Sequence, residues 1–157
     1  MNKTQRYESL LVSAKTLMGT DDDWITRMAN ISSLLYHTLE HVNWAGFYRA
    51  DGDMLLLGPF QGKPACTPIP FGKGVCGTCA AKKTVQCIEN VHEFPGHIAC
   101  DSASNSEIVM PIIEKDTLIG VLDIDSNAFH NFDETDIRYL TRLIDLMLIH
   151  DEYGNKK

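Results

Sequence analysis

Three stretches of the chain repeat apolar residues at the three-to-four-residue spacing of a helix. The first is expected over residues 4–18, and the second from the acidic caps at 21–23 to about His41. The third is expected over 134–150, with Asp133 as its cap. Their buried faces should be, in order, Leu10, Leu11, Ala14 and Leu17; then Trp24, Met28, Ile31, Leu35 and Leu39; then Ile137, Leu140, Ile144 and Met147.

Shorter apolar runs between the second and third helices predict strands. Asp51-Gly52 is a two-residue hairpin signal, and a second hairpin turns at 114–116. A short helix is expected over 74–83. The strands should cover 43–50, 53–60, 84–88, 107–113 and 117–125. Because strands arrive as hairpins and not with helical crossovers, we expect an α+β fold: an antiparallel sheet with helices on one or both faces. No repeat or linker interrupts residues 1–157, so one domain is expected.

The charge of the chain and its cysteine content limit the classes of function that it can have. The net charge is −7 and no Lys/Arg-rich run occurs, which argues against nucleic acid or an anionic membrane as a partner. The N-terminus lacks the apolar core of a signal peptide, and no apolar run is long enough to span a membrane, so a cytoplasmic protein is expected. Five cysteines in such a chain indicate redox chemistry or metal binding rather than a disulfide framework.

The polar stretch 89–106 has neither helical nor strand periodicity and predicts a long loop. It contains Cys100 among small polar residues, and Pro95-Gly96 would let the loop act as a lid. A cysteine in a polar, partly exposed place suits nucleophilic or redox chemistry. The loop alone favours neither this interpretation nor a chance surface cysteine.

Cys76 and Cys79 form a CxxC motif at the start of the short helix, where the helix N-terminus would favour a thiolate. A thioredoxin-type motif would need a βαβ context, which is absent. Structural zinc is disfavoured because only one cysteine pair is present. Its further ligands would have to come from Cys66, Cys87, Cys100 or His97. For Cys79 and Cys87, the simplest expectation is that they are small buried apolar residues.

Acidic and aromatic side chains on predicted strands form a second candidate site. Asp123 and Asp125 alternate with apolar residues and share one strand face, and Glu107 begins the partner strand. Three adjacent acids repel, so one should hold a proton near neutral pH; the cluster could bind an ammonium and donate a proton. A solvated acidic face is the alternative. Trp44 and Tyr48 share a face and could wall an apolar slot, although the pattern alone favours core packing.

Four blocks of sequence resemble the free methionine-(R)-sulfoxide reductases, which are small GAF-domain proteins. The blocks are NWAGFY at 43–48, LGPFQGKPACTPIPFGKGVCG at 57–77, HIACDSASNSEIVMPI at 97–112 and GVLDIDS at 120–126. They span most of the chain, from the first hairpin to the last helix. The resemblance implies a GAF-like antiparallel sheet flanked by helices.

The resemblance also implies site residues and a reaction. Cys100 matches the catalytic nucleophile, Cys66 the resolving cysteine and Cys76 an auxiliary thiol. The acids match the substrate-binding carboxyls, and the two aromatic residues match the walls around the methionine side chain. The implied reaction reduces free L-methionine-(R)-sulfoxide through a sulfenic acid and an intramolecular disulfide, which thioredoxin recycles, with no metal or organic cofactor. A homodimer is possible. The alternatives are a ligand-sensing GAF module without catalysis and a zinc-binding structural protein.

Overall fold

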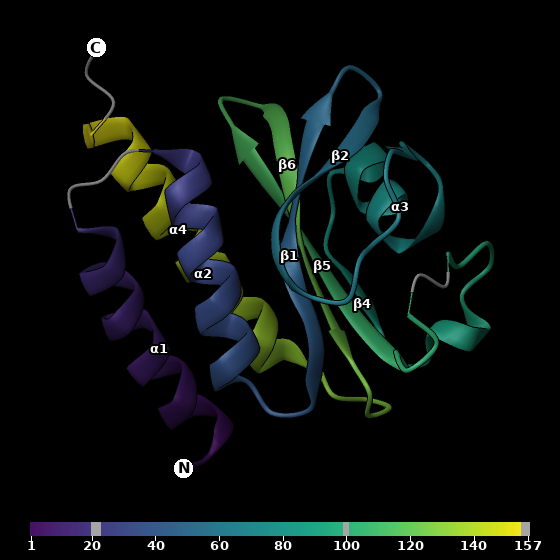
Figure 1. The fold of residues 1–157 in the computed structure, drawn as a ribbon, viewed down its shortest axis with the longest axis horizontal. Coiled ribbons are helices and arrows are strands. Elements are labelled where there is room, and N and C mark those ends of the chain that lie inside the picture. Colours follow the sequence, from purple (N-terminus) through teal and green to yellow (C-terminus); the bar gives the residue numbers. More distant parts are fainter. Residues whose placement is uncertain (20–22, 99–100, 155–157) are drawn as a thin grey trace.

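The computed structural model describes residues 1–19, 23–98 and 101–154. The predicted helices and strands occur in the predicted order, and the structure adds a short strand at Ile69–Pro70 and a 3₁₀ turn at Val91–Glu93, which the sequence analysis did not predict (Figure 1). The elements are α1 (Lys3–Met18), α2 (Trp24–Thr38), β1 (Val42–Asp51), β2 (Met54–Gly62), β3 (Ile69–Pro70), α3 (Gly74–Lys82), β4 (Gln86–Ile88), the 3₁₀ turn η1 (Val91–Glu93), β5 (Ser106–Glu114), β6 (Thr117–Ser126) and α4 (Glu134–Gly154). None of the helices in the described ranges is long and apolar enough to cross a membrane.

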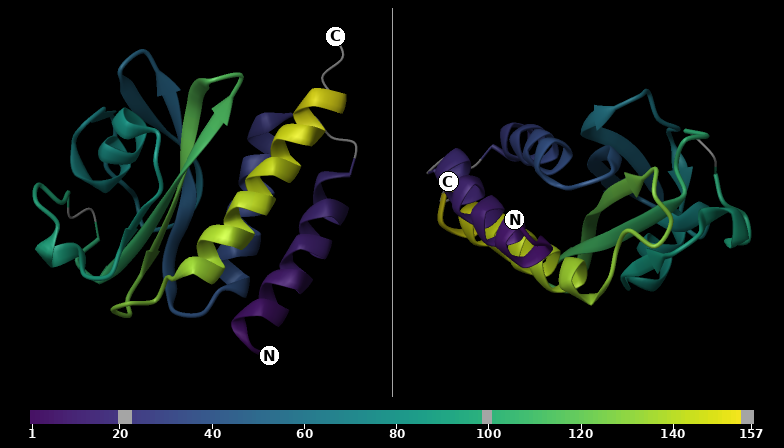
Figure 2. Two further views of the ribbon diagram at one scale, coloured as in Figure 1. Left: turned by 180° about the vertical axis from the view of Figure 1, so that it is seen from behind. Right: turned by 90° about the horizontal axis from the view of Figure 1, so that it is seen from below.

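A six-stranded antiparallel sheet forms the centre of the molecule, with strand order β3-β2-β1-β6-β5-β4. Helices α1, α2 and α4 lie together over one face, and α3 lies over the other (Figures 1 and 2). Both predicted hairpins are present as β1–β2 and β5–β6. The expected α+β architecture with an antiparallel sheet is therefore confirmed.

The two sheet faces have separate cores because strand side chains alternate between them. On β1, Ala45 and Phe47 face the layer of three helices, whereas Trp44 and Tyr48 face α3. The first core is the larger, and it fixes the sheet against the helix layer. The second core borders the segment that joins β2 to α3, and it surrounds the candidate site.

Several sequence expectations needed correction at helix ends. Leu17 is 45% exposed, and Tyr7 and Met18 are buried in its place. Helix α2 ends at Thr38 instead of about His41, because Leu39 adopts an extended conformation (φ −79°, ψ 145°). Helix α4 continues to Gly154, four residues past the expected end. Its predicted cap is confirmed: the Asp133 carboxylate accepts a hydrogen bond from the Thr135 N–H at 2.9 Å.

Candidate active site

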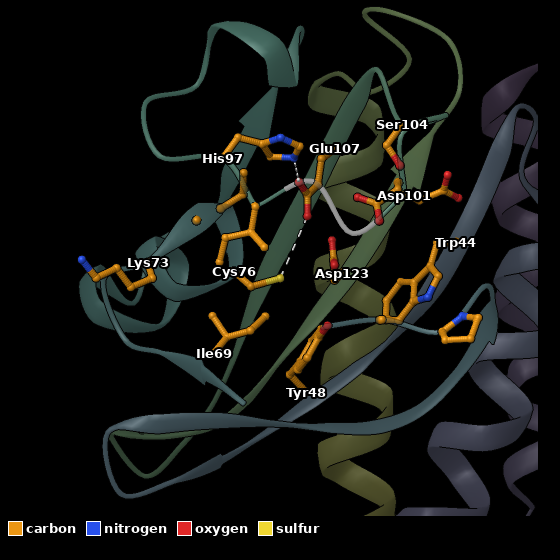
Figure 3. A pocket seen from close by; sticks show the side chains of 16 residues that line it. Trp44, Tyr48, Ile69, Lys73, Cys76, His97, Asp101, Ser104, Glu107 and Asp123 are labelled. Atoms are coloured by element: carbon orange, nitrogen blue, oxygen red, sulfur yellow. Dashed lines mark hydrogen bonds and ion pairs between the residues drawn. The ribbon is translucent and has the colours of Figure 1, made fainter. Parts of the chain in front are cut away.

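Strand register brings the three predicted acids together. Glu107 on β5 pairs with Asp125 on β6, and Trp44 on β1 also pairs with Asp125. Asp123 lies two residues away along β6 and so shares the face of Asp125. Glu107 and Asp123 are only 5% and 6% exposed, and all three acids line one pocket on the α3 side of the sheet (Figure 3). A solvated acidic surface is therefore the wrong description of this cluster.

Burial governs the ionisation of these acids. Burial raises the pKa of each of the three acids, Glu107, Asp123 and Asp125, and it is the largest cause of each shift. The charge of Asp123 raises the pKa of the other two further. Glu107 forms side-chain hydrogen bonds with Asp123 and Asp125, which lower the pKa of these two and raise that of Glu107. Within the cluster, the proton is therefore held best by Glu107.

Cys76, in the first turn of α3, lies against the same cluster. Its Sγ is 4.0 Å from Oε2 of Glu107, and the residue is 5% exposed. Burial, and then the charges of Asp123 and Glu107, raise the pKa of the Cys76 thiol well above its usual range. The expectation that the helix N-terminus favours a thiolate here is wrong, because desolvation and nearby negative charge outweigh the helix dipole.

The second cysteine of the CxxC motif does not reach the pocket. The Cys79 Sγ lies 3.7 Å from the carbonyl oxygen of Val109, and burial raises its pKa to about 12. Cys79 is thus the small buried residue that the sequence predicts. Cys87 is only half-buried, with its Sγ 3.6 Å from the Phe132 carbonyl. The two thiols of the motif do not act as a pair.

An aromatic wall closes another side of the pocket. Trp44 and Tyr48 stack with ring centroids 6.0 Å apart, and Trp44 also stacks on Phe60 at 5.2 Å. Gly46 makes this stack possible, because a Cβ there would lie 2.3 Å from the Phe60 Cβ. The Tyr48 hydroxyl donates to the carbonyl of Cys66 at 2.8 Å. The wall therefore also holds the backbone of a predicted redox residue at the pocket.

Cys66 and Cys100 are the two remaining cysteines of the predicted site, and only Cys66 lies within the described residues. Cys66 is disulfide-bonded. Cys100, and with it the predicted pairing of Cys66 with Cys100, lies outside the described residues. Asp101, the next residue along the chain, lines the pocket. The Asn43 side-chain amide donates to Asp101 at 3.1 Å and to Ser104 at 3.0 Å, which attaches this end of the loop to β1.

The pocket contains residues to which sequence reasoning gave no substrate role. The sequence suggests only a zinc-ligand role for His97, yet its Nε2 lies 3.8 Å from Oε1 of Glu107. Burial, and then the charge of His92, lower the pKa of His97. The pocket, its open mouth included, encloses about 550 Å³. Its other lining residues are Pro64, Ala65, Ile69, Lys73, Gly74, Val75, Ile98, Asp101 and Ser104. Since most of them lie on irregular segments, no periodic pattern could have identified them.

The buried acids predict a measurable effect on stability. The folded chain holds a proton on Glu107 that the unfolded chain releases above about pH 4.3. The free energy of unfolding should therefore fall as the pH rises through the raised pKa. Replacing Glu107 by Gln should raise this free energy at about pH 8 by about 1 kcal/mol. Urea denaturation at about pH 5 and about pH 8 would measure it.

The matched control is Glu114→Gln at the end of the same strand, outside the pocket-lining set. It should leave the pH dependence of stability unchanged. If Glu107→Gln lost stability with pH as steeply as the unsubstituted chain, the pH dependence would come from Asp123 and Asp125, whose pKa burial also raises, and not from Glu107.

Comparison with known proteins identifies the family. The GAF domain family model matches residues 28–149. The chain is 51% identical over 156 residues to the free methionine-R-sulfoxide reductase of Escherichia coli K12, covering 98% of this chain and 94% of that protein.

Solved structures agree with this match. The free methionine-R-sulfoxide reductase of Neisseria meningitidis, solved with its substrate, has a TM-score of 0.94 at 39% identity, covering 99% of this chain and 94% of that one. A putative GAF sensor protein from Burkholderia vietnamiensis has a TM-score of 0.93 at 46% identity over the whole of both chains. The resemblance seen in the sequence is thereby confirmed, and the chain belongs to the free methionine-R-sulfoxide reductase family of GAF-domain proteins.

Proposed function

We propose that the chain reduces free L-methionine-(R)-sulfoxide to L-methionine with electrons from its cysteine thiols. The observation that carries this proposal is the pocket itself. It combines a buried, proton-holding carboxyl cluster with an apolar aromatic wall that is hydrogen-bonded to the redox residue Cys66. A protonated acid beside a sulfur nucleophile is what sulfoxide reduction needs, because the sulfoxide becomes a good electrophile only when its oxygen is protonated.

The pocket offers complementary surfaces to the two ends of the substrate. The acid cluster attracts the α-ammonium, and Asp123 contributes a buried Oδ1 with no hydrogen-bond partner among the described residues. The S-methyl group would rest on the face of Trp44, which is 3% exposed. A free amino acid satisfies both contacts, whereas a residue within a peptide has no α-ammonium. Selectivity for the free amino acid follows from this difference.

The chemical steps transfer two electrons and one oxygen atom. The Cys100 thiolate attacks the sulfoxide sulfur while a carboxyl, which we assign to Glu107, protonates the oxygen. The substrate S–O bond and the new S–S bond then break, the oxygen is transferred with its proton to the Cys100 sulfur as a sulfenic acid, and methionine leaves. The Cys66 thiol then attacks this sulfur, water departs, and a Cys66–Cys100 disulfide forms. An external dithiol, for which we propose thioredoxin, reduces the disulfide by exchange.

Cys76 has an auxiliary role in this scheme. Its buried thiol, with a raised pKa, is neutral near pH 7 and lies beside Glu107, so it supports the cluster instead of attacking the substrate. No step requires a metal or an organic cofactor, since thiols supply both electrons.

A sensing module is the second candidate function. One similar structure, that from Burkholderia vietnamiensis, is described as a putative sensor. A sensor would bind an amino acid in this pocket without consuming reductant. Reductant consumption therefore distinguishes the two functions directly.

The deciding experiment is NADPH oxidation in a thioredoxin-coupled assay. Free methionine-(R)-sulfoxide, the free S epimer and a peptide-bound sulfoxide would be offered separately. We expect turnover of the free R epimer alone. Binding of the R epimer without NADPH oxidation, even with a chemical dithiol as reductant, would favour the sensing module.

A further inference from the structure

A thiol and two carboxyls converge at the floor of the pocket. Ligand atoms of Cys76, Glu107 and Asp123 all lie within 4.8 Å of one another, and all three residues are buried. Figure 3 shows the three side chains pointing toward one another from α3, β5 and β6. These three elements belong to separate parts of the fold, so the convergence depends on the tertiary structure and is not visible in the CxxC motif.

A second observation indicates that this cluster lacks a positive partner. Oδ1 of Asp123 is buried without a hydrogen-bond partner among the described residues, and the residue is 6% exposed. A buried carboxylate oxygen left unpaired is costly. Lys73 lines the pocket, but Figure 3 shows its amino group pointing away from the acids. A bound cation would satisfy the unpaired oxygen.

We propose that Cys76, Glu107 and Asp123 form a binding site for a zinc ion, or another divalent ion of that class, which competes with the substrate ammonium. The competition rests on the proposed function, whereas the binding does not. Metal binding at this site would therefore inhibit the reductase when a thiophilic metal is in excess. This site differs from the zinc site considered from the sequence, because Cys79 points to Val109 and takes no part.

The geometry suits zinc. Zinc bonds of about 2.3 Å to sulfur and about 2.0 Å to oxygen, at a tetrahedral angle, place the two ligand atoms about 3.5 Å apart. The distance from the Cys76 Sγ to Oε2 of Glu107 is 4.0 Å, which a small side-chain rotation would reduce. His97 lies 3.8 Å from the other oxygen of Glu107 and can orient this carboxylate from outside the coordination sphere.

The donor set also selects the metal. A thiolate ligand disfavours magnesium and calcium, which prefer oxygen donors alone. Three protein ligands leave a fourth tetrahedral position, which water can fill.

Cobalt(II) is the probe for the test, because a thiolate bound to it gives a strong near-ultraviolet charge-transfer absorption. Titration of the whole protein should reach about one cobalt per chain. Cys76→Ser should lose the absorption. The matched control Cys79→Ser, four-fifths of a helical turn away and outside the pocket-lining set, should keep it. Adding zinc should bleach it.

A second variant tests the same site independently, in case Cys76→Ser does not fold. Asp123→Asn should weaken cobalt binding at least about tenfold, with the thermal melting transition still cooperative. Absorption that persists in Cys76→Ser, or unchanged affinity in Asp123→Asn, would overturn the proposal.

Competition is tested separately with free methionine, which cannot be reduced further. In a preparation with demonstrated reductase activity, saturating methionine should displace cobalt. Cobalt absorption unaffected by methionine would overturn the shared site. If reductase activity is absent but cobalt binds through Cys76, the metal site stands and the proposed function fails.

Discussion

Replacing Cys100 by Ser is expected to abolish turnover of free methionine-(R)-sulfoxide. A serine hydroxyl is not ionised near neutral pH and cannot carry the sulfoxide oxygen as a sulfenic acid. Neither Cys76 nor Cys79 can substitute, because burial raises the pKa of both thiols and keeps them neutral. The thioredoxin-coupled assay should therefore show no NADPH oxidation above background.

The matched control is Cys79→Ser, which replaces a buried thiol outside the pocket-lining set. It should retain the activity of the unsubstituted chain if the protein remains folded. Substantial turnover by Cys100→Ser with any regenerating dithiol would assign the nucleophile to another cysteine.

Cys66→Ser separates the two half-reactions. With the resolving thiol removed, the first step still proceeds, so pre-reduced protein should yield about one methionine per chain and then stop. Mass spectrometry should detect the added oxygen, or its adduct with a thiol-trapping reagent, on Cys100. Absence of this single turnover would contradict the division of roles between the two cysteines.

The candidate site could be predicted from the sequence where periodicity determines the geometry. Period-2 alternation put Asp123 and Asp125 on one strand face, and the predicted hairpin allowed Glu107 to face the same site, which the observed register confirms. The same logic placed Trp44 and Tyr48 on one face of β1, and the structure shows that this face lines the same pocket as the acids. Short-range patterns therefore predicted the strand-borne half of the site.

The other half depends on contacts that no local pattern encodes. His97 reaches Glu107 from an irregular loop, and Asn43 holds Asp101 from the beginning of β1. The ionisation of Cys76 was predicted with the wrong sign, because its position in the helix is visible in the sequence but its burial against two acids is not. The prediction for Leu17 was wrong for a related reason: Tyr7 is buried against α4, where its ring stacks on Tyr139, and Met18 is buried as well, whereas Leu17 is exposed.

Glu107→Gln is expected to lower kcat by roughly 10²–10⁴-fold, the usual loss when a general acid is removed. An amide of the same shape keeps the hydrogen-bond donor toward Asp123 and Asp125 but cannot release a proton. In the unsubstituted chain, kcat should fall as the pH rises through the raised pKa of Glu107, because the reactive form is the protonated acid. In the variant this alkaline decline should disappear. Steady-state kinetics across the neutral to alkaline range would measure both effects.

Glu114→Gln serves again as the control, since it makes the same change on the same strand outside the pocket-lining set. The stability prediction strengthens the test: Glu107→Gln should be more stable than the unsubstituted chain at about pH 8, so lost activity cannot be attributed to unfolding. If kcat and its alkaline decline survived in Glu107→Gln but vanished in Asp125→Asn, the transferred proton would belong to Asp125. The hydrogen bond between Glu107 and Asp125 lowers the pKa of Asp125 and raises that of Glu107. We therefore expect the transferred proton to come from Glu107.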